Sequence, residues 1–161
     1  MGYNRKIIIM SRNVIERLAD RPFDIPTALI SIADADCDFA ALTNKPQFIL
    51  QLAFDDVDND EFIDELGENP TIEEKCRVEE KYNIITDEQA GQIAVFYNEV
   101  WDKSDVFICQ CEYGQSRSAA VAAAIMEYRD RSGIEIFAHD NYCPNKLVFR
   151  KVFEALNKTE M

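Results

Sequence analysis

The eight residues Cys111-Glu112-Tyr113-Gly114-Gln115-Ser116-Arg117-Ser118 join two segments of different character. The apolar run 105–110 comes before them and the alanine-rich segment 118–129 comes after them. The first segment has the pattern of a buried strand and the second that of a helix, so the eight residues form a loop that leads into a helix N-terminus. Such a loop binds anions, because its N–H groups and the helix dipole present positive partial charge.

The residue types in this loop suit phosphoryl transfer through a cysteine. Cys111 lies in the field of the helix N-terminus, which favours the nucleophilic thiolate, and Arg117 can hold two phosphate oxygens with its planar guanidinium. We expect Cys111 to attack phosphorus and form a phosphocysteine that water hydrolyses. The residues expected to bind the substrate, through backbone N–H groups or side chains, are Glu112, Tyr113, Gly114, Gln115, Ser116 and Ser118.

The loop CEYGQSRS resembles the signature of the cysteine-dependent protein tyrosine phosphatase superfamily, and most closely its compact dual-specificity-like branch, which includes small bacterial members. That signature is a CX5R loop with Gly at its fourth position and Ser or Thr after the Arg. Cys111, Gly114, Arg117 and Ser118 match it. The resemblance covers most of the chain and implies that the Ser118 hydroxyl stabilises the departing thiolate. A plain helix N-cap is the alternative role of Ser118.

One position departs from the signature. Gln110 stands where the family has a His before the nucleophile. A Gln side chain can donate a hydrogen bond but carries no positive charge. We therefore expect Cys111 to ionise less readily than in His-containing relatives, which predicts a slower enzyme or a shifted pH optimum.

The leaving group also needs a proton donor, and three aspartates are candidates. Asp55, Asp56 and Asp58 follow the apolar run 47–54. The resemblance implies a general-acid aspartate on a loop after a strand upstream of the Cys, and on that basis we favour Asp56. Asp55 is the second choice, and a solvent-facing loop acid is the alternative role for Asp55 and Asp58.

The rest of the chain predicts a single α/β domain over residues 1–161, with a central, mostly parallel sheet flanked by helices, as in dual-specificity phosphatases. The expected strands are 6–10, 28–33, 47–54 and 105–110, and the expected helices are 11–20, 86–103, 118–129 and a last one that begins near Pro144. Thr86 and Gln89 form a capping box. The segment 55–68 has eight carboxylates, with Asp60 as the cap of a short helix that ends at Gly67. The segment 69–82 is expected to be a surface excursion.

Composition restricts the possible partners. The chain has 161 residues, a formal net charge of −13 and a pI of about 4.4, which argues against nucleic-acid binding. No apolar run approaches the length of roughly 20 residues that spans a bilayer. The five cysteines form no C-x-x-C pair and His139 is the one histidine, so we expect no metal or other cofactor. An odd number of cysteines without a paired motif indicates a protein of the reducing cytoplasm.

Three functions are compatible with the sequence. The favoured one is a phosphatase that acts on phosphotyrosine, and also on phosphoserine or phosphothreonine, in proteins. The others are a weak or inactive phosphate-binding pseudophosphatase and a phosphatase of a non-protein phosphate ester. Lipid-directed relatives usually carry extra Lys in the loop, and this loop has none. Cys109 could trap oxidised Cys111 as a disulfide, although core packing is the favoured role. The sequence does not determine the oligomeric state or whether residues 55–80 form a lid.

Overall fold

The computed structural model describes residues 6–58 and 63–159. Its centre is a sheet of four strands, β1 (Ile7–Ser11), β2 (Thr27–Ala33), β3 (Phe48–Ala53) and β4 (Val106–Cys111), in the order β1-β4-β2-β3. Every neighbouring pair in this sheet is parallel, so the described sheet is parallel throughout rather than mostly parallel. The carboxyl ends of all four strands therefore meet at one edge, where ligands bind in open α/β sheets.

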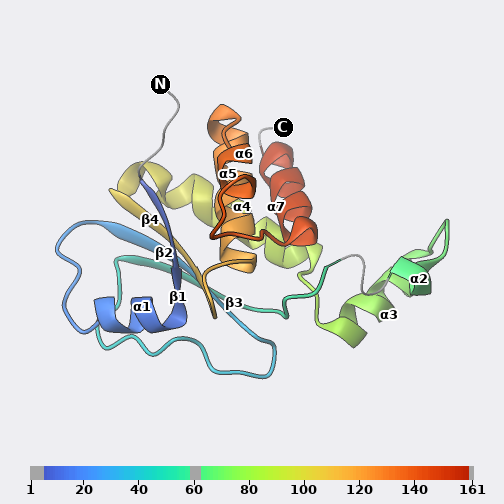
Figure 1. The fold of residues 1–161 in the computed structure, drawn as a ribbon, viewed down its shortest axis with the longest axis horizontal. Helices are drawn as coiled ribbons and strands as arrows, with labels where there is room; N and C mark the ends of the chain where they lie inside the picture. The colour runs from blue at the N-terminus through green and yellow to red at the C-terminus, as the bar shows by residue number, and fades with distance from the viewer. Residues whose placement is uncertain (1–5, 59–62, 160–161) are drawn as a thin grey trace.

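Helices cover both faces of the sheet (Figure 1). The helices α4 (Asp87–Val100), α5 (Arg117–Asp130) and α7 (Lys146–Lys158) pack on one face, and the short helix α1 (Arg12–Leu18) lies on the other. A short 3-10 turn, Trp101–Lys103, extends α4, and α6 (Ile134–Phe137) follows α5. No helix among the described residues is long and apolar enough to cross a membrane.

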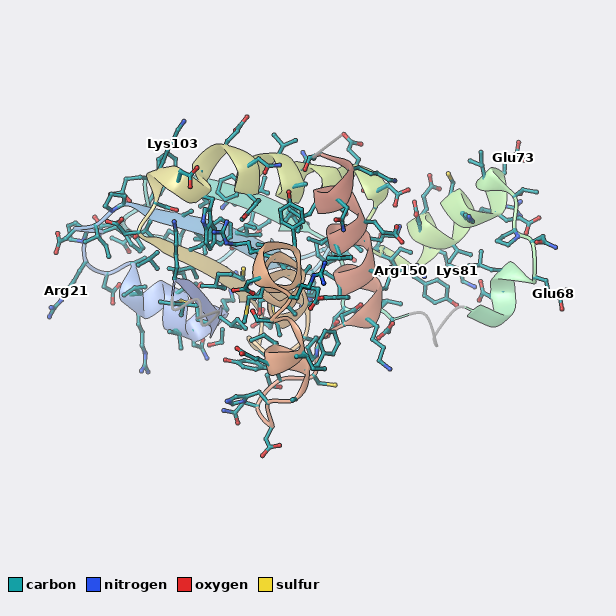
Figure 2. All side chains as sticks on the ribbon, turned by 90° about the horizontal axis from the view of Figure 1, so that it is seen from above. Arg21, Glu68, Glu73, Lys81, Lys103 and Arg150 are labelled. Carbon is teal, nitrogen blue, oxygen red and sulfur yellow. The ribbon has the colours of Figure 1, made fainter. Side chains whose placement is uncertain are left out.

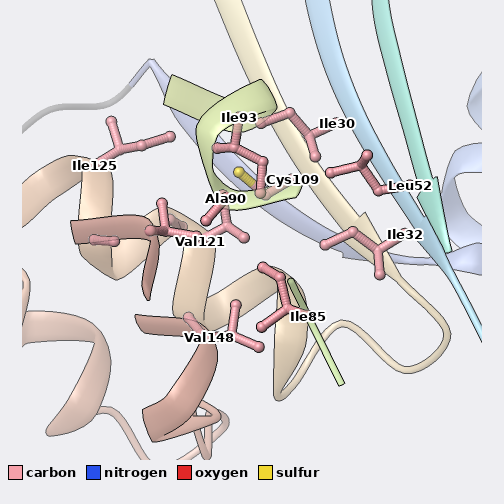
Figure 3. Packing of buried hydrophobic residues seen from close by; sticks show 14 of the residues in the cluster. Ile30, Ile32, Leu52, Ile85, Ala90, Ile93, Cys109, Val121, Ile125 and Val148 are labelled. Carbon is pink, nitrogen blue, oxygen red and sulfur yellow. The ribbon is translucent and has the colours of Figure 1, made fainter. Parts of the chain in front are cut away.

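The core helix α5 fixes where the predicted loop ends. Every residue of α5 from Arg117 to Met126 is buried, and alanine dominates this stretch. Side chains this small let the helix lie close to the sheet and to α7 at the same time. The main hydrophobic cluster fills the space between these elements, with Ile30, Ile93, Val121 and Val148 among its members (Figure 3). This packing places the N-terminus of α5 near the end of β4.

Several predicted elements occur where the sequence pattern indicated them. Ser11 is the N-cap of α1 and accepts a hydrogen bond from Val14 N–H. Thr86 and Gln89 form the predicted capping box at the start of α4. Gln89 also donates from Nε2 to the carbonyl of Ala53 over 2.9 Å, which ties α4 to the end of β3.

One helix was not predicted. The segment 69–82 lies at the surface, as expected, but it contains a helix, α3 (Ile72–Tyr82), that the sequence analysis did not identify. Thr71 caps it and only Val78 is buried in it, so its apolar signal is too weak to stand out among the charges. With α2 (Ile63–Leu66), α3 extends to one side of the sheet, as Figure 2 also shows. The predicted cap Asp60 lies outside the described residues, whereas Gly67 has the positive φ of +67° expected at a helix end.

The last helix begins later than predicted. Pro144 precedes α7 rather than occupying its first turn, because Asn145 is the N-cap and accepts a hydrogen bond from Val148 N–H. This shift of two residues has consequences for the site, since it places the Asn145 side chain beside the predicted phosphate loop.

Candidate active site

The loop after β4 lies against the end of β1. Gly114 has a φ of +69°, a conformation that side-chain-bearing residues rarely adopt. A Cβ atom at this position would lie 2.8 Å from both the carbonyl carbon of Met10 and the nitrogen of Ser11. Both the positive φ and the close approach of the loop to the end of β1 therefore require glycine at position 114.

The carbonyl groups of the loop point outward. Glu112 C=O accepts from Arg12 N–H over 3.1 Å, Gln115 C=O from Cys143 N–H over 2.8 Å, and Ser116 C=O from Asn145 N–H over 3.2 Å. In a trans peptide the C=O and the following N–H point in opposite directions, and the described chain has no cis peptides. The N–H groups that follow these three carbonyls therefore point away from the neighbouring segments, as an anion-binding loop requires.

The N-terminus of α5 has no side-chain cap. Ser116 occupies the N-cap position, but its side chain makes no capping hydrogen bond. Its Oγ instead donates to Asp56 Oδ1 over 2.8 Å. The first turn of α5 also contains no acidic residue. The first N–H groups of the helix and the positive end of its dipole thus remain available for an anion.

Cys111, the predicted nucleophile, contacts Ser118, which is predicted to stabilise its thiolate. Cys111, at the end of β4, is 2% exposed, and its Sγ lies 3.0 Å from Ser118 Oγ. Ser118 is fully buried in the first turn of α5 and is not the N-cap, so the plain capping role considered for it was wrong. A hydroxyl at this distance can donate a hydrogen bond to a thiolate.

Arg117 is buried, and its Nε lacks a hydrogen-bond partner among the described residues although its Nη1 has two. Its Nη1 donates to the carbonyl of Phe54 over 2.7 Å and pairs with Asp34 Oδ1 over 2.8 Å. These contacts hold the guanidinium between the segments that follow β2 and β3. Its Nε is buried without a hydrogen-bond partner among the described residues. A buried donor left unpaired costs free energy, which a ligand oxygen would recover.

The three candidate acids lie in different places. Asp56 Oδ1 accepts from Ser116 Oγ over 2.8 Å and from Asn145 Nδ2 over 2.9 Å, so it lies beside the loop. Asp55 accepts from Ala35 N–H over 2.9 Å. Asp58 accepts over 3.2 Å from the N–H of Lys146, which is the first residue of α7. Of the three, Asp56 is the one whose carboxylate contacts the loop.

Asn145 is a site residue that the sequence analysis missed. It is 3% exposed. Its N–H holds the loop at Ser116, its Nδ2 donates to Asp56 and to the carbonyl of Val57, and its Oδ1 caps α7. The only sequence signal was an Asn after Pro144, which is a common helix start. Asp34 was missed as well, because nothing in its local sequence points to Arg117.

Gln110 lies on the other face of the sheet from Cys111. Successive strand residues alternate in direction. Cys109 and Cys111 accordingly belong to the core on the α5 side, while Ile108 belongs to the smaller cluster on the α1 side. The Gln110 Oε1 accepts a hydrogen bond from Ser31 Oγ on β2, and its Nε2 donates to the Cys111 carbonyl over 3.1 Å. Gln110 thus orients the backbone of Cys111 without adding a charge.

Cys109 is a core residue. It is fully buried, and Figure 3 shows it among apolar side chains that include Ile30, Ala90 and Ile93. Burial, with a smaller contribution from nearby Cys111, raises the pKa of the Cys109 thiol far above its ordinary value. The thiol therefore remains neutral, as suits core packing.

A pocket of about 490 Å³ opens beside the loop. It is lined by Asp34, Asp36, Cys37, Asp55, Asp56, Glu112, Tyr113 and Arg117. A larger groove of about 620 Å³ lies between α4, α7 and the edge strand β3, but none of the predicted site residues lines it. The smaller pocket is therefore the better candidate for the active site, because predicted site residues line it. No group of three or more potential metal ligands occurs among the described residues.

The comparisons with known proteins agree on the fold. A mouse protein described as a dual specificity phosphatase, solved with zinc tungstate, has a TM-score of 0.58 at 12% identity, covering 98% of this chain and 86% of its own. Human DUSP28 has a TM-score of 0.55 and Tk-PTP in its active form 0.52, each at 12% identity and covering 98% of this chain and 95% of theirs. No family model and no curated protein sequence matches the chain. The chain thus has the fold of dual-specificity and protein tyrosine phosphatases over nearly its full length.

Replacing Gly114 by Ala is expected to destabilise the protein by roughly 1–3 kcal/mol, because the residue must keep a strained φ while its Cβ meets the end of β1. Gly91→Ala on α4 is the matched control. Nothing lies within 4 Å of a Cβ at position 91, so this change should stabilise the helix by about 0.5–1 kcal/mol. Urea unfolding followed by circular dichroism measures both. Equal effects of the two variants would contradict this account of the loop.

Cys109 is expected to resist alkylation in the folded protein, because its thiol is buried and its raised pKa keeps it protonated. Cys37, Cys76 and Cys143 are exposed and should react with iodoacetamide at pH 8. Peptide mass spectrometry of native and urea-unfolded samples distinguishes the sites. Native labelling of Cys109 as fast as that of Cys76 would show that the core opens readily.

Proposed function

We propose that this protein is a cysteine-dependent phosphatase that hydrolyses phosphate monoesters, with phosphotyrosine and phosphoserine or phosphothreonine in proteins as substrates. The observation that carries the proposal is the contact of 3.0 Å between Cys111 Sγ and Ser118 Oγ at the uncapped start of α5. Buried Arg117, with its unpaired Nε, lies in the same loop. This arrangement combines a nucleophile, an anion cradle and a cation.

In the first step the Cys111 thiolate attacks phosphorus. The S–P bond forms while the bond from phosphorus to the leaving oxygen breaks. Backbone N–H groups of the loop and Arg117 hold the three equatorial oxygens, and Arg117 enters the step already held by Asp34 and the Phe54 carbonyl. Asp56, in its protonated form, gives its proton to the leaving oxygen.

In the second step water attacks the phosphocysteine. Asp56, now a carboxylate, takes a proton from that water, and the S–P bond breaks to release phosphate. The Ser118 hydroxyl donates to Sγ and stabilises the thiolate as it leaves. Asn145 and Ser116 keep the Asp56 carboxylate beside the loop for both steps.

The fold supports an active phosphatase, whereas Gln110 supports a pseudophosphatase. The fold of dual-specificity phosphatases supports the enzyme. The mouse protein was solved with zinc tungstate, and tungstate is a tetrahedral oxyanion like phosphate. A pseudophosphatase that only binds phosphate is the second candidate, because the side chain of Gln110 lies on the opposite face and brings no cation to Cys111. The following experiment separates the two.

Wild-type protein is expected to hydrolyse p-nitrophenyl phosphate, and Cys111→Ser should abolish turnover because the nucleophile is lost. The same variant should still be stabilised by tungstate in a thermal melt, since the cradle remains and a ligand that binds only the folded state raises Tm. Absence of turnover by wild type between pH 5 and 8, together with tungstate stabilisation, would favour the pseudophosphatase. Absence of both would reject a phosphate site.

Asp56→Asn is expected to lower kcat for an alkyl phosphate by about 10²–10⁴-fold, because an alkoxide cannot leave without a proton. Its effect on p-nitrophenyl phosphate should be much smaller, since that leaving group is already a stable anion. Asp58→Asn is the matched control, because the Asp58 carboxylate accepts from the start of α7 instead. If Asp56→Asn hydrolyses the alkyl phosphate as fast as wild type, Asp56 is not the general acid.

A further inference from the structure

The pocket beside the loop is unusually acidic for a site that binds phosphate. Its lining contains five carboxylates and one guanidinium, that of Arg117. The carboxylates come from three segments, namely 34–36 after β2, 55–56 after β3, and Glu112 in the loop itself. They therefore surround the entrance from more than one direction.

Only part of this negative charge is balanced inside the protein. Asp34 pairs with Arg117 over 2.8 Å, and Glu112 pairs with Arg12 over 3.4 Å. Asp55 and Asp56 accept hydrogen bonds from uncharged groups. Asp36 is exposed, and its carboxylate has no hydrogen-bond or ion-pair partner in the described part of the chain. An empty site of this composition leaves a negative field at its mouth.

A phosphate monoester adds a charge of about −1.5 to −2 to that field. The buried, unpaired Nε of Arg117 attracts its oxygens at short range, but the rim opposes any further negative charge on the substrate. Cationic groups close to the phosphate would relieve this repulsion. Tyr113 is 77% exposed on the same rim, and its ring offers a face on which an Arg or Lys side chain can lie.

We infer that the substrates of this site are phosphopeptide segments in which Lys or Arg residues flank the phosphorylated residue. The inference rests on the proposed function and narrows its substrate class. An extended peptide fits the arrangement better than a small ester, because a chain can bring cations to carboxylates on different sides of the pocket. The acidic rim selects such segments and rejects acidic ones by repulsion.

The first test measures binding to Cys111→Ser, so that turnover does not interfere. Three phosphotyrosine peptides of equal length, with Lys/Arg, Ser/Gly or Glu/Asp flanks, are compared by fluorescence anisotropy at 50 mM and 500 mM NaCl. At 50 mM the basic peptide should bind at least about tenfold more tightly than the acidic one. The ratio should shrink at 500 mM, because salt shortens the range of the field.

The second test separates the rim from the overall charge of −13. Combining Asp36→Asn with Cys111→Ser should reduce the basic-to-acidic ratio about two- to threefold. The control combines Cys111→Ser with Glu99→Gln, which removes one negative charge at an exposed position on α4 that lines the groove between α4 and α7, and should leave the ratio unchanged. The basic peptide without phosphate should bind at least about tenfold more weakly than its phosphorylated form.

The outcomes for the inference and for the proposed function are distinct. Equal binding of basic and acidic phosphopeptides, or preference for the acidic one, overturns the inference even if wild type hydrolyses p-nitrophenyl phosphate. Equal effects of Asp36→Asn and Glu99→Gln, or equally tight binding of the unphosphorylated basic peptide, also overturn it, since overall charge would then explain the preference. If wild type does not hydrolyse p-nitrophenyl phosphate, the proposed phosphatase activity is contradicted. The binding ratio would still show which phosphopeptides the pocket selects.

Discussion

The close approach of Gly114 to the end of β1 is the constraint on which the site depends. It brings the loop against the Met10–Ser11 backbone, where no Cβ could fit. In that position Glu112 C=O meets Arg12 N–H, and the carbonyls of Gln115 and Ser116 meet the segment before α7. With its carbonyls turned outward, the loop presents N–H groups to the interior. This geometry is the one that anion-binding loops have, and it arises from backbone packing rather than from charged side chains.

The electrostatics of the site follow from how Arg117 is held. Asp34 and the Phe54 carbonyl bind its Nη1 from the segments after β2 and β3, while its Nε stays buried and unpaired. The guanidinium is thus already oriented, so the proposed reaction would require no reorganisation of this side chain. Asp34 is the one acid of the pocket that pairs with Arg117, and the remaining carboxylates of the lining make the pocket negative. In the proposed phosphatase, Arg117 would hold the phosphate inside the pocket while the acidic rim would repel substrates with further negative charge.

Local signals in the sequence identified most elements correctly. The apolar runs became strands and the Thr86–Gln89 box began α4, because both depend on residues close together in the chain. Helix α3 was missed because a single buried residue, Val78, leaves almost no periodic pattern. The start of α7 was misplaced because Pro144 and Asn145 both suit a helix N-terminus, and only the observed hydrogen bond to Val148 distinguishes them.

The sequence by itself determined the candidate phosphate loop, because Cys111, Gly114, Arg117 and Ser118 lie within eight consecutive positions where strand, turn and helix signals are all local. Tertiary structure alone decided which acid meets that loop. Asp56 and Ser116 are 60 positions apart, and Asp56 and Asn145 are 89 apart, yet both pairs are hydrogen-bonded. Parallel strand order brings such distant residues to one edge of the sheet, and no local pattern records which side chains will meet there.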